Sequence, residues 1–150
     1  MVIGIFGESC TGKSTLAEKI AAGFPCEIFT GKDYLRLAKS ETIAKALFQK
    51  KLAGAMDGEN IIYVISEKEH LPLLPEGALR ILVTADLEMI KSRFAQRMRG
   101  NLPAPVAAML EKKHGCFDDA PYDFHVVSGE TDLDLVVEKI KDTKMSEKQK

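Results

Sequence analysis

The chain has 150 residues, of which 45% are hydrophobic and 29% charged, with a formal net charge of −1 at pH 7. This length suits one domain with one continuous core, and the near-neutral charge provides no field that favours nucleic acid or an anionic membrane. The apolar runs are too short for a membrane span or a secretion signal, and the three cysteines are too scattered for a disulfide framework. We therefore expect a single cytoplasmic domain over 1–150 without nucleic-acid or membrane partners; the oligomeric state is left open.

Short runs rich in β-branched and aromatic residues alternate with stretches of helical periodicity, an order typical of a parallel sheet flanked by helices. Five strands are predicted, at Val2–Phe6, Glu27–Thr30, Ile61–Ile65, Leu79–Thr84 and Phe124–Val127. The expected fold class is therefore α/β, with a five-stranded parallel sheet as the middle of three layers.

The first predicted strand leads into Gly7-Glu8-Ser9-Cys10-Thr11-Gly12-Lys13-Ser14, which has the spacing G-x-x-x-x-G-K-[ST]. A helix is expected to start near Lys13 and to end at Gly23. A strand before this spacing and a helix after it are the setting in which it forms a phosphate-binding loop, the Walker A motif. The N–H groups of such a loop converge on one anion, and the helix N-terminus adds positive partial charge. The alternative is a plain glycine turn.

The loop predicts a nucleotide site in which Lys13 reaches the β- and γ-phosphates and the Ser14 hydroxyl binds Mg²⁺. Cys10 is interpreted as a small residue that fits a crowded loop rather than as a redox group. The expected ATP-binding residues are Gly7, Glu8, Ser9, Cys10, Thr11, Gly12, Lys13, Ser14 and Thr15.

A second helical region is expected between Asp33 and Met56, with a break near Ser40 and a turn at 57–60 before the third strand. The side chains expected to face the core from this region are Ile43, Leu47 and Leu52.

Asp86 is predicted to cap a helix that runs to about Arg99. Its core face is expected to carry Ile90, Phe94 and Met98. Residues 100–121 contain three prolines and form a predicted lid-like excursion with one short helix at 106–113. A last helix is expected at 132–142, followed by a disordered tail at 144–150.

Arginine is scarce in this chain, with 5 arginines against 16 lysines, yet Arg93, Arg97 and Arg99 fall within seven residues. Arg93 and Arg97 are one helical turn apart, so their guanidinium groups point the same way. Paired arginines favour planar, bidentate contact with phosphate oxygens, and the alternative is a solvated helix face.

Taken in order, four stretches resemble the nucleoside monophosphate kinases, especially the small cytidylate kinases of archaeal type. They are the glycine loop, residues 28–39 (IFTGKDYLRLAK), residues 82–88 with the arginines that follow, and residues 121–127 (PYDFHVV). The resemblance implies a P-loop kinase fold with ATP and Mg²⁺ as donor and a lid over the phosphates.

On the matching positions, the resemblance implies that 33–58 binds the acceptor. Thr30, Gly31 and Arg36 are the expected substrate contacts, whereas Arg93 and Arg97 are expected to stabilise the transferring phosphoryl group beside Lys13.

The chain departs from that family after the third strand, where an aspartate-glycine pair is replaced by Ser66-Glu67-Lys68. Glu67 is therefore the remaining candidate for an acidic metal contact. Asp33 is interpreted either as a catalytic group, a second Mg²⁺ contact or a base that orients the acceptor, or as a helix N-cap.

The leading prediction is an ATP-dependent phosphotransferase that moves the γ-phosphoryl group to a small acceptor, with a nucleoside monophosphate as the first choice. One alternative is a shikimate kinase-like enzyme or another small-molecule kinase, although that family's aspartate-x-aspartate appears here only as Lys32-Asp33. The other alternative is a nucleotide-binding ATPase module without a dedicated acceptor.

Overall fold

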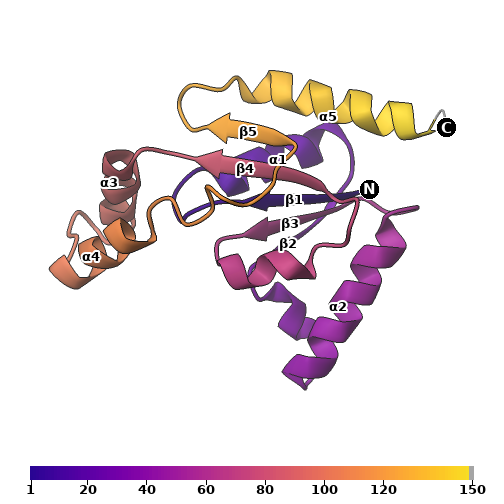
Figure 1. The fold of residues 1–150 in the computed structure, drawn as a ribbon, viewed down its shortest axis with the longest axis horizontal. Helices are drawn as coiled ribbons and strands as arrows, with labels where there is room; N and C mark the ends of the chain where they lie inside the picture. Colours follow the sequence, from indigo (N-terminus) through magenta and orange to yellow (C-terminus); the bar gives the residue numbers. More distant parts are fainter. Residues whose placement is uncertain (149–150) are drawn as a thin grey trace.

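The computed structural model describes residues 1–148, with side chains as far as Lys144, as an α/β fold built on one parallel five-stranded sheet (Figure 1). The strand order is β2-β3-β1-β4-β5. The strands are β1 (Val2–Phe6), β2 (Glu27–Thr30), β3 (Ile61–Ile65), β4 (Leu79–Thr84) and β5 (Phe124–Val127). All five strand predictions are confirmed, because each strand is a short apolar run bounded by turn residues.

Helices and 3₁₀ segments connect the strands. They are α1 (Lys13–Gly23), η1 (Asp33–Leu37), α2 (Glu41–Ala55), η2 (Lys68–Leu73), α3 (Leu87–Arg97), α4 (Ala104–Lys113) and α5 (Leu133–Lys148). No helix in the described part of the chain is both long enough and apolar enough to cross a bilayer.

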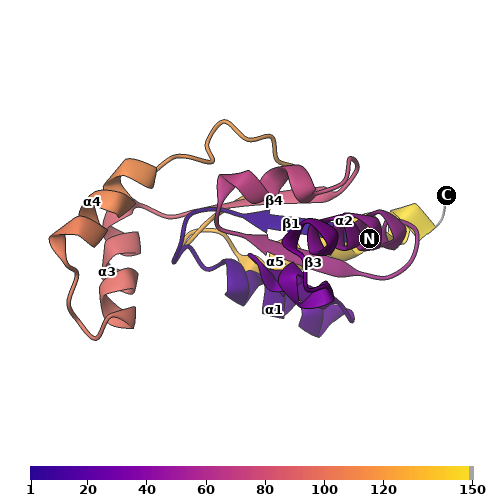
Figure 2. The ribbon, with the colours of Figure 1, turned by 90° about the horizontal axis from the view of Figure 1, so that it is seen from below.

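The sheet is buried on both faces, which explains why β1 and β3 are continuously apolar. Successive side chains alternate, so Ile3 and Ile5 pack with α1 and α5 while Phe6 packs with α2 and η2. Figure 2 shows α1 and η2 on opposite faces of the sheet. The two resulting hydrophobic clusters form the core of the three-layer fold.

The expected core face of α2 is wrong by one position along the helix. Ile43 and Leu47 are exposed by 55% and 43%, whereas Leu52 is buried as expected. The buried stripe consists of Ala44, Phe48, Leu52 and Ala55. Phe48 is the largest of these side chains and packs on Phe29 with ring centroids 4.9 Å apart, and this contact sets the rotation of the helix.

Helices α3 and α4 form a hairpin that stands beyond the carboxyl ends of the strands (Figure 1). Asp86 caps α3 as predicted, with its Oδ1 accepting from the Met89 N–H at 2.7 Å. The helix ends at Arg97 rather than Arg99, and Met98 is 38% exposed. Ile90 and Phe94 pack against α4, so the apolar face of α3 serves a small local core instead of the main one.

The predicted disordered tail starts too early, because α5 continues to Lys148. Lys144 extends over the Phe24 ring, 4.6 Å from its centroid, and this contact holds the helix to the N-terminal half of the fold. The last two residues of the predicted tail, 149–150, lie outside the described residues.

Candidate functional site

The glycine loop lies between β1 and α1, at the carboxyl edge of the sheet where ligands of open α/β folds bind. A Cβ on Gly7 would stand 2.2 Å from the Val83 carbonyl oxygen, so only glycine lets the loop pass β4. Gly12 has φ of +97° and serves as the N-cap of α1. The two invariant positions of the motif are thus both glycine for reasons of backbone geometry.

Lys13 is 5% exposed, and its ammonium donates to the Glu8 carbonyl oxygen across the loop. The Thr11 hydroxyl donates to the same oxygen at 2.9 Å. Burial, with a smaller contribution from the nearby Arg97 guanidinium, lowers the pKa of Lys13 from 10.5 to about 8. A buried ammonium with few partners is ready to bind a negatively charged group that enters the loop.

Arg93 joins the glycine loop to the loop after β5. Its Nη1 donates to the Cys10 carbonyl oxygen at 3.0 Å and to the Ser128 hydroxyl at 2.9 Å. Cys10 has φ of +63°, which is uncommon for a residue with a side chain, and the Arg93 contact holds its peptide in place. The structure therefore gives Arg93 a positioning contact to the loop.

A cavity of about 800 Å³ lies beside the loop, between α3 and the loop after β5. Arg93 and Arg97 line it from α3, while Thr11, Gly12 and Thr15 line it from the glycine loop. Its other contributors include Gln96, Ser128 and Gly129, which the sequence did not single out. The cavity has the size and position of a nucleotide site that opens onto the helix N-terminus.

The residues expected to touch the acceptor lie after β2. Asp33 is exposed, and its Oδ2 accepts from the Thr30 N–H at 2.9 Å, which closes a turn rather than capping η1. The Gly31 N–H donates to the Val64 carbonyl oxygen at 2.9 Å, so this backbone is fixed to β3. These residues do reach the carboxyl edge of the sheet.

Arg36 points away from that edge. Its guanidinium carbon lies 4.4 Å from the centroid of the Phe29 ring, and its Nη2 is 3.6 Å from the Glu27 Oε1 at the start of β2. In this arrangement Arg36 faces the opposite end of the strand from the glycine loop. The structure therefore does not bring Arg36 together with Lys13 and Arg97.

Residues 114–120, here called the cover segment, pack over the carboxyl ends of β1 and β3. Phe117 is 2% exposed and lies on Phe6, with ring centroids 5.8 Å apart. The Glu8 carboxylate accepts from the Gly115 N–H at 3.2 Å and lies 3.1 Å from the His114 Nδ1. The sequence had placed this stretch in the second half of a lid-like excursion, without any sign of a buried anchor.

A second pair of contacts ties the cover segment and the end of α4 to η2. The Lys68 ammonium donates to the Asp119 carboxylate at 2.8 Å, and Lys113 lies 3.5 Å from Glu67. These two ion pairs join segments that are far apart in the sequence, so local sequence patterns do not reveal them.

The metal-binding predictions concern Ser14 and Glu67. Ser14 is exposed at the first turn of α1, next to Lys13, whereas the Glu67 carboxylate is paired with Lys113. Among the side chains that the structure describes, no group of three His, Cys, Asp or Glu residues is arranged to hold a metal ion.

Searches with the sequence against family models and curated proteins found no match, whereas solved structures with a similar fold are many. A shikimate kinase from Acinetobacter baumannii in complex with shikimate has a TM-score of 0.64 at 12% identity, covering 99% of this chain and 95% of that one. A gluconokinase from Sinorhizobium meliloti has a TM-score of 0.59 at 15% identity, covering 91% and 87%. A deoxyadenosine kinase from M. mycoides with bound dATP has a TM-score of 0.54 at 21% identity, covering 95% and 98%.

The chain has the fold of the P-loop kinases. The predicted fold class is confirmed by the sheet order and by these similar structures. They act on different acceptors, so they support the P-loop kinase fold in general and do not single out the nucleoside monophosphate kinases. Sequence identities this low support the fold alone.

Proposed function

We propose that this protein is an ATP-dependent phosphotransferase that moves the γ-phosphoryl group of ATP to a hydroxyl group of a small molecule. The observation that carries the proposal is the buried Lys13 ammonium in a glycine loop that opens onto a cavity of about 800 Å³. ATP would supply the phosphoryl group, and Mg²⁺ would neutralise the charge of the phosphates. The P-loop kinase fold supports this reading, because its members place the same loop at the same edge.

The chain's own residues contribute position and positive charge. The loop amides and Lys13 bind the β- and γ-phosphates, and the Ser14 hydroxyl is a ligand for Mg²⁺, with Glu67 as a second candidate. Arg97 lines the cavity and adds positive charge near Lys13. Arg93 acts through Cys10 and Ser128, since its contacts hold the loop in shape.

The placement of Arg36 supports one class of acceptor over another. For a nucleoside monophosphate, the first choice from sequence, the Arg36 guanidinium was expected to bind the phosphate near Thr30 and Gly31. Arg36 instead pairs with Glu27, and this pairing favours a second candidate, an acceptor without a phosphate group. Such acceptors are consistent with the deoxyadenosine kinase and gluconokinase among the similar structures.

The first test is nucleotide binding by the full chain, measured with a fluorescent ATP analogue in the presence of Mg²⁺. Lys13→Ala should weaken binding at least tenfold, because the buried ammonium is lost. Lys19→Ala is the matched control, since Lys19 lies on the same helix but is exposed and pairs with Asp134 at 3.2 Å. Equal binding by the wild type and Lys13→Ala would contradict the proposed site.

The second test measures ADP release with a panel of acceptors. Stimulation by one of them supports a kinase. ATP binding with slow hydrolysis and no stimulation by any acceptor would instead select the nucleotide-binding module. Loss of stimulation in Arg36→Ala, with ATP affinity retained, would return the acceptor to the monophosphate class.

A further inference from the structure

Two buried polar atoms near the expected acceptor site have no hydrogen-bond partner among the described residues. They are the Tyr34 hydroxyl and the His70 Nδ1. The two side chains are 0% and 4% exposed, respectively, so bulk water does not reach them. Buried polar groups in folded proteins are nearly always paired, and an unpaired one destabilises the protein that carries it. Two in one cluster require an explanation.

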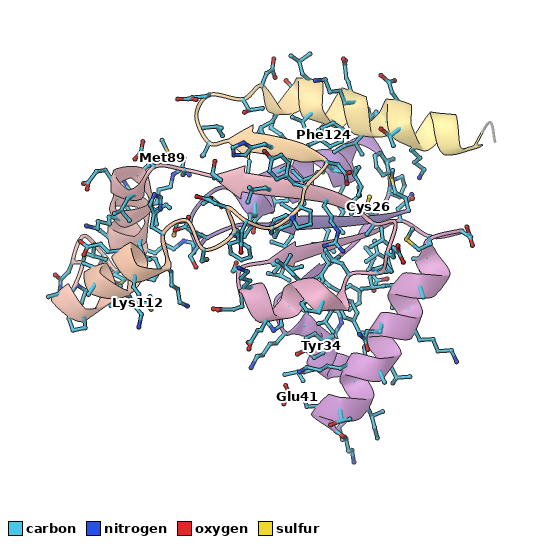
Figure 3. All side chains as sticks on the ribbon, in the orientation of Figure 1. Cys26, Tyr34, Glu41, Met89, Lys112 and Phe124 are labelled. Atoms are coloured by element: carbon cyan, nitrogen blue, oxygen red, sulfur yellow. The ribbon has the colours of Figure 1, made fainter. Side chains whose placement is uncertain are left out.

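Both residues lie at the carboxyl edge, on the segments that follow β2 and β3. Tyr34 belongs to η1 and His70 to η2, and their rings meet edge to face with centroids 6.2 Å apart. Figure 3 shows Tyr34 between η2 and α2. Strand β3 pairs directly with β1, so η2 is next to the glycine loop. This is the side of the loop opposite the nucleotide cavity.

The surroundings of the two atoms are aromatic. Tyr34 stacks on Phe48 with centroids 5.6 Å apart, and Glu69 is 3.8 Å from the His70 Nε2. An anionic group of a ligand that reached these two atoms would lie among aromatic rings, and its desolvation would be uncompensated.

We infer that the Tyr34 hydroxyl and the His70 Nδ1 are specificity-determining contacts for an uncharged hydroxyl compound, reached when η1 and η2 separate. The inference rests on the proposed function and names its acceptor class. Both segments are short 3₁₀ helices, whose hydrogen-bond geometry is poorer than that of an α-helix, and η2 contains Pro72. A ligand that hydrogen-bonds to both atoms relieves the two unpaired groups, and this relief offsets the cost of opening.

Thermal unfolding of the free protein gives the first measurement. Tyr34→Phe removes an unpaired hydroxyl, so the melting temperature should stay the same or rise. Tyr63→Phe is the matched control in the same cluster, because the Tyr63 hydroxyl donates to the Gly31 carbonyl oxygen at 2.7 Å. That variant should melt lower, by about 3 °C. If Tyr34→Phe melts lower to the same degree, the hydroxyl is satisfied by an internal water and the inference is wrong.

Steady-state kinetics gives the second measurement, with matched pairs of neutral and anionic probes. The pairs are cytidine with its monophosphate, deoxyadenosine with its monophosphate, and glucose with gluconate. ADP release should be stimulated by a neutral member. Tyr34→Phe and His70→Gln should raise the KM for that probe at least tenfold and change the KM for ATP less than twofold. His70→Asn, which keeps a polar atom near the Nδ1 position, should restore part of the affinity.

The outcomes separate the inference from the proposed function. If the full chain does not bind the fluorescent ATP analogue, the proposed function itself is wrong. Normal ATP binding with stimulation by anionic members alone, or by none of the probes, overturns the acceptor class while the nucleotide site stands. An unchanged acceptor KM in both Tyr34→Phe and His70→Gln overturns the role of the two residues.

Discussion

At the level of single residues, the backbone geometry of the phosphate loop requires glycine at two positions. Gly7 passes within contact of the β4 backbone, and Gly12 adopts a positive φ. Both requirements are local consequences of stereochemistry, so a short motif predicts them. The burial of Lys13 is different, because it depends on the packing of side chains from several elements around the loop.

The depressed pKa of Lys13 predicts that nucleotide affinity depends on pH. Lys13 has a pKa of about 8 in the free protein, and bound phosphates should raise it because they favour the charged form. Affinity should therefore be constant below pH 8 and fall above it, by up to about tenfold per pH unit, with a proton taken up on binding.

Calorimetry between pH 7 and 9.5, in buffers with different heats of ionisation, measures both the affinity and the proton uptake. Lys13→Arg is the control, since a guanidinium stays charged over this range and should remove the pH dependence. An affinity of the wild type that is flat to pH 9.5 would contradict the assignment of this pKa to a phosphate-binding group.

Individual elements were predicted well where their ends carry their own signals. Ser40 caps α2, with its hydroxyl accepting from the Ile43 N–H, and Asp86 caps α3, so both helix starts are readable. It was harder to predict which face of each helix is turned toward the core. On α2 several apolar residues compete for the core, and the contact between Phe48 and Phe29, from a neighbouring strand, decides which of them are buried.

Helix α3 carries Arg93 and Arg97, for which the sequence predicts the same role. In the structure the two side chains have different contacts. Arg93→Ala should lower both nucleotide affinity and the free energy of unfolding, the latter by about 1–3 kcal/mol, because the Cys10 carbonyl oxygen and the Ser128 hydroxyl lose their donor. Arg97→Ala should lower turnover with little change in unfolding, since Arg97 is exposed where it lines the cavity.

Urea unfolding and steady-state kinetics on the two variants make this comparison. Arg99→Ala serves as the reference, because Arg99 is an exposed arginine just beyond the end of the same helix. If Arg93→Ala unfolds like the Arg99 variant, the positioning contact to the loop has no energetic weight.

At the scale of the whole molecule, the cover segment packs over the carboxyl edge of the sheet, although it comes late in the chain. Phe117→Ala should detach the cover segment and destabilise the protein by about 3 kcal/mol, because a buried aromatic ring on Phe6 is lost. The amide hydrogens of Gly115, Asp118 and Ala120 should then exchange faster, whereas those of β1 should exchange as before relative to global stability.

Hydrogen exchange followed by mass spectrometry measures the exchange of the cover segment and of β1 in one experiment. Tyr122→Ala is a suitable comparison, since Tyr122 is an aromatic residue close by that is 47% exposed. Unchanged exchange over 114–120 in Phe117→Ala would mean that the polar contacts of Glu8 and Lys68 hold the segment alone.

Sequence by itself determined the strands, the phosphate loop and the order of the elements, because these depend on hydrophobic runs and glycine stereochemistry within a few residues. Tertiary structure decided which side chains meet at the site. Arg93 reaches Cys10 across 83 positions, and His114 reaches Glu8 across 106. Such contacts are set by how helices pack on the sheet, and no local pattern encodes them. Arg36 shows the same limit, since its partner is chosen by the geometry of an edge strand.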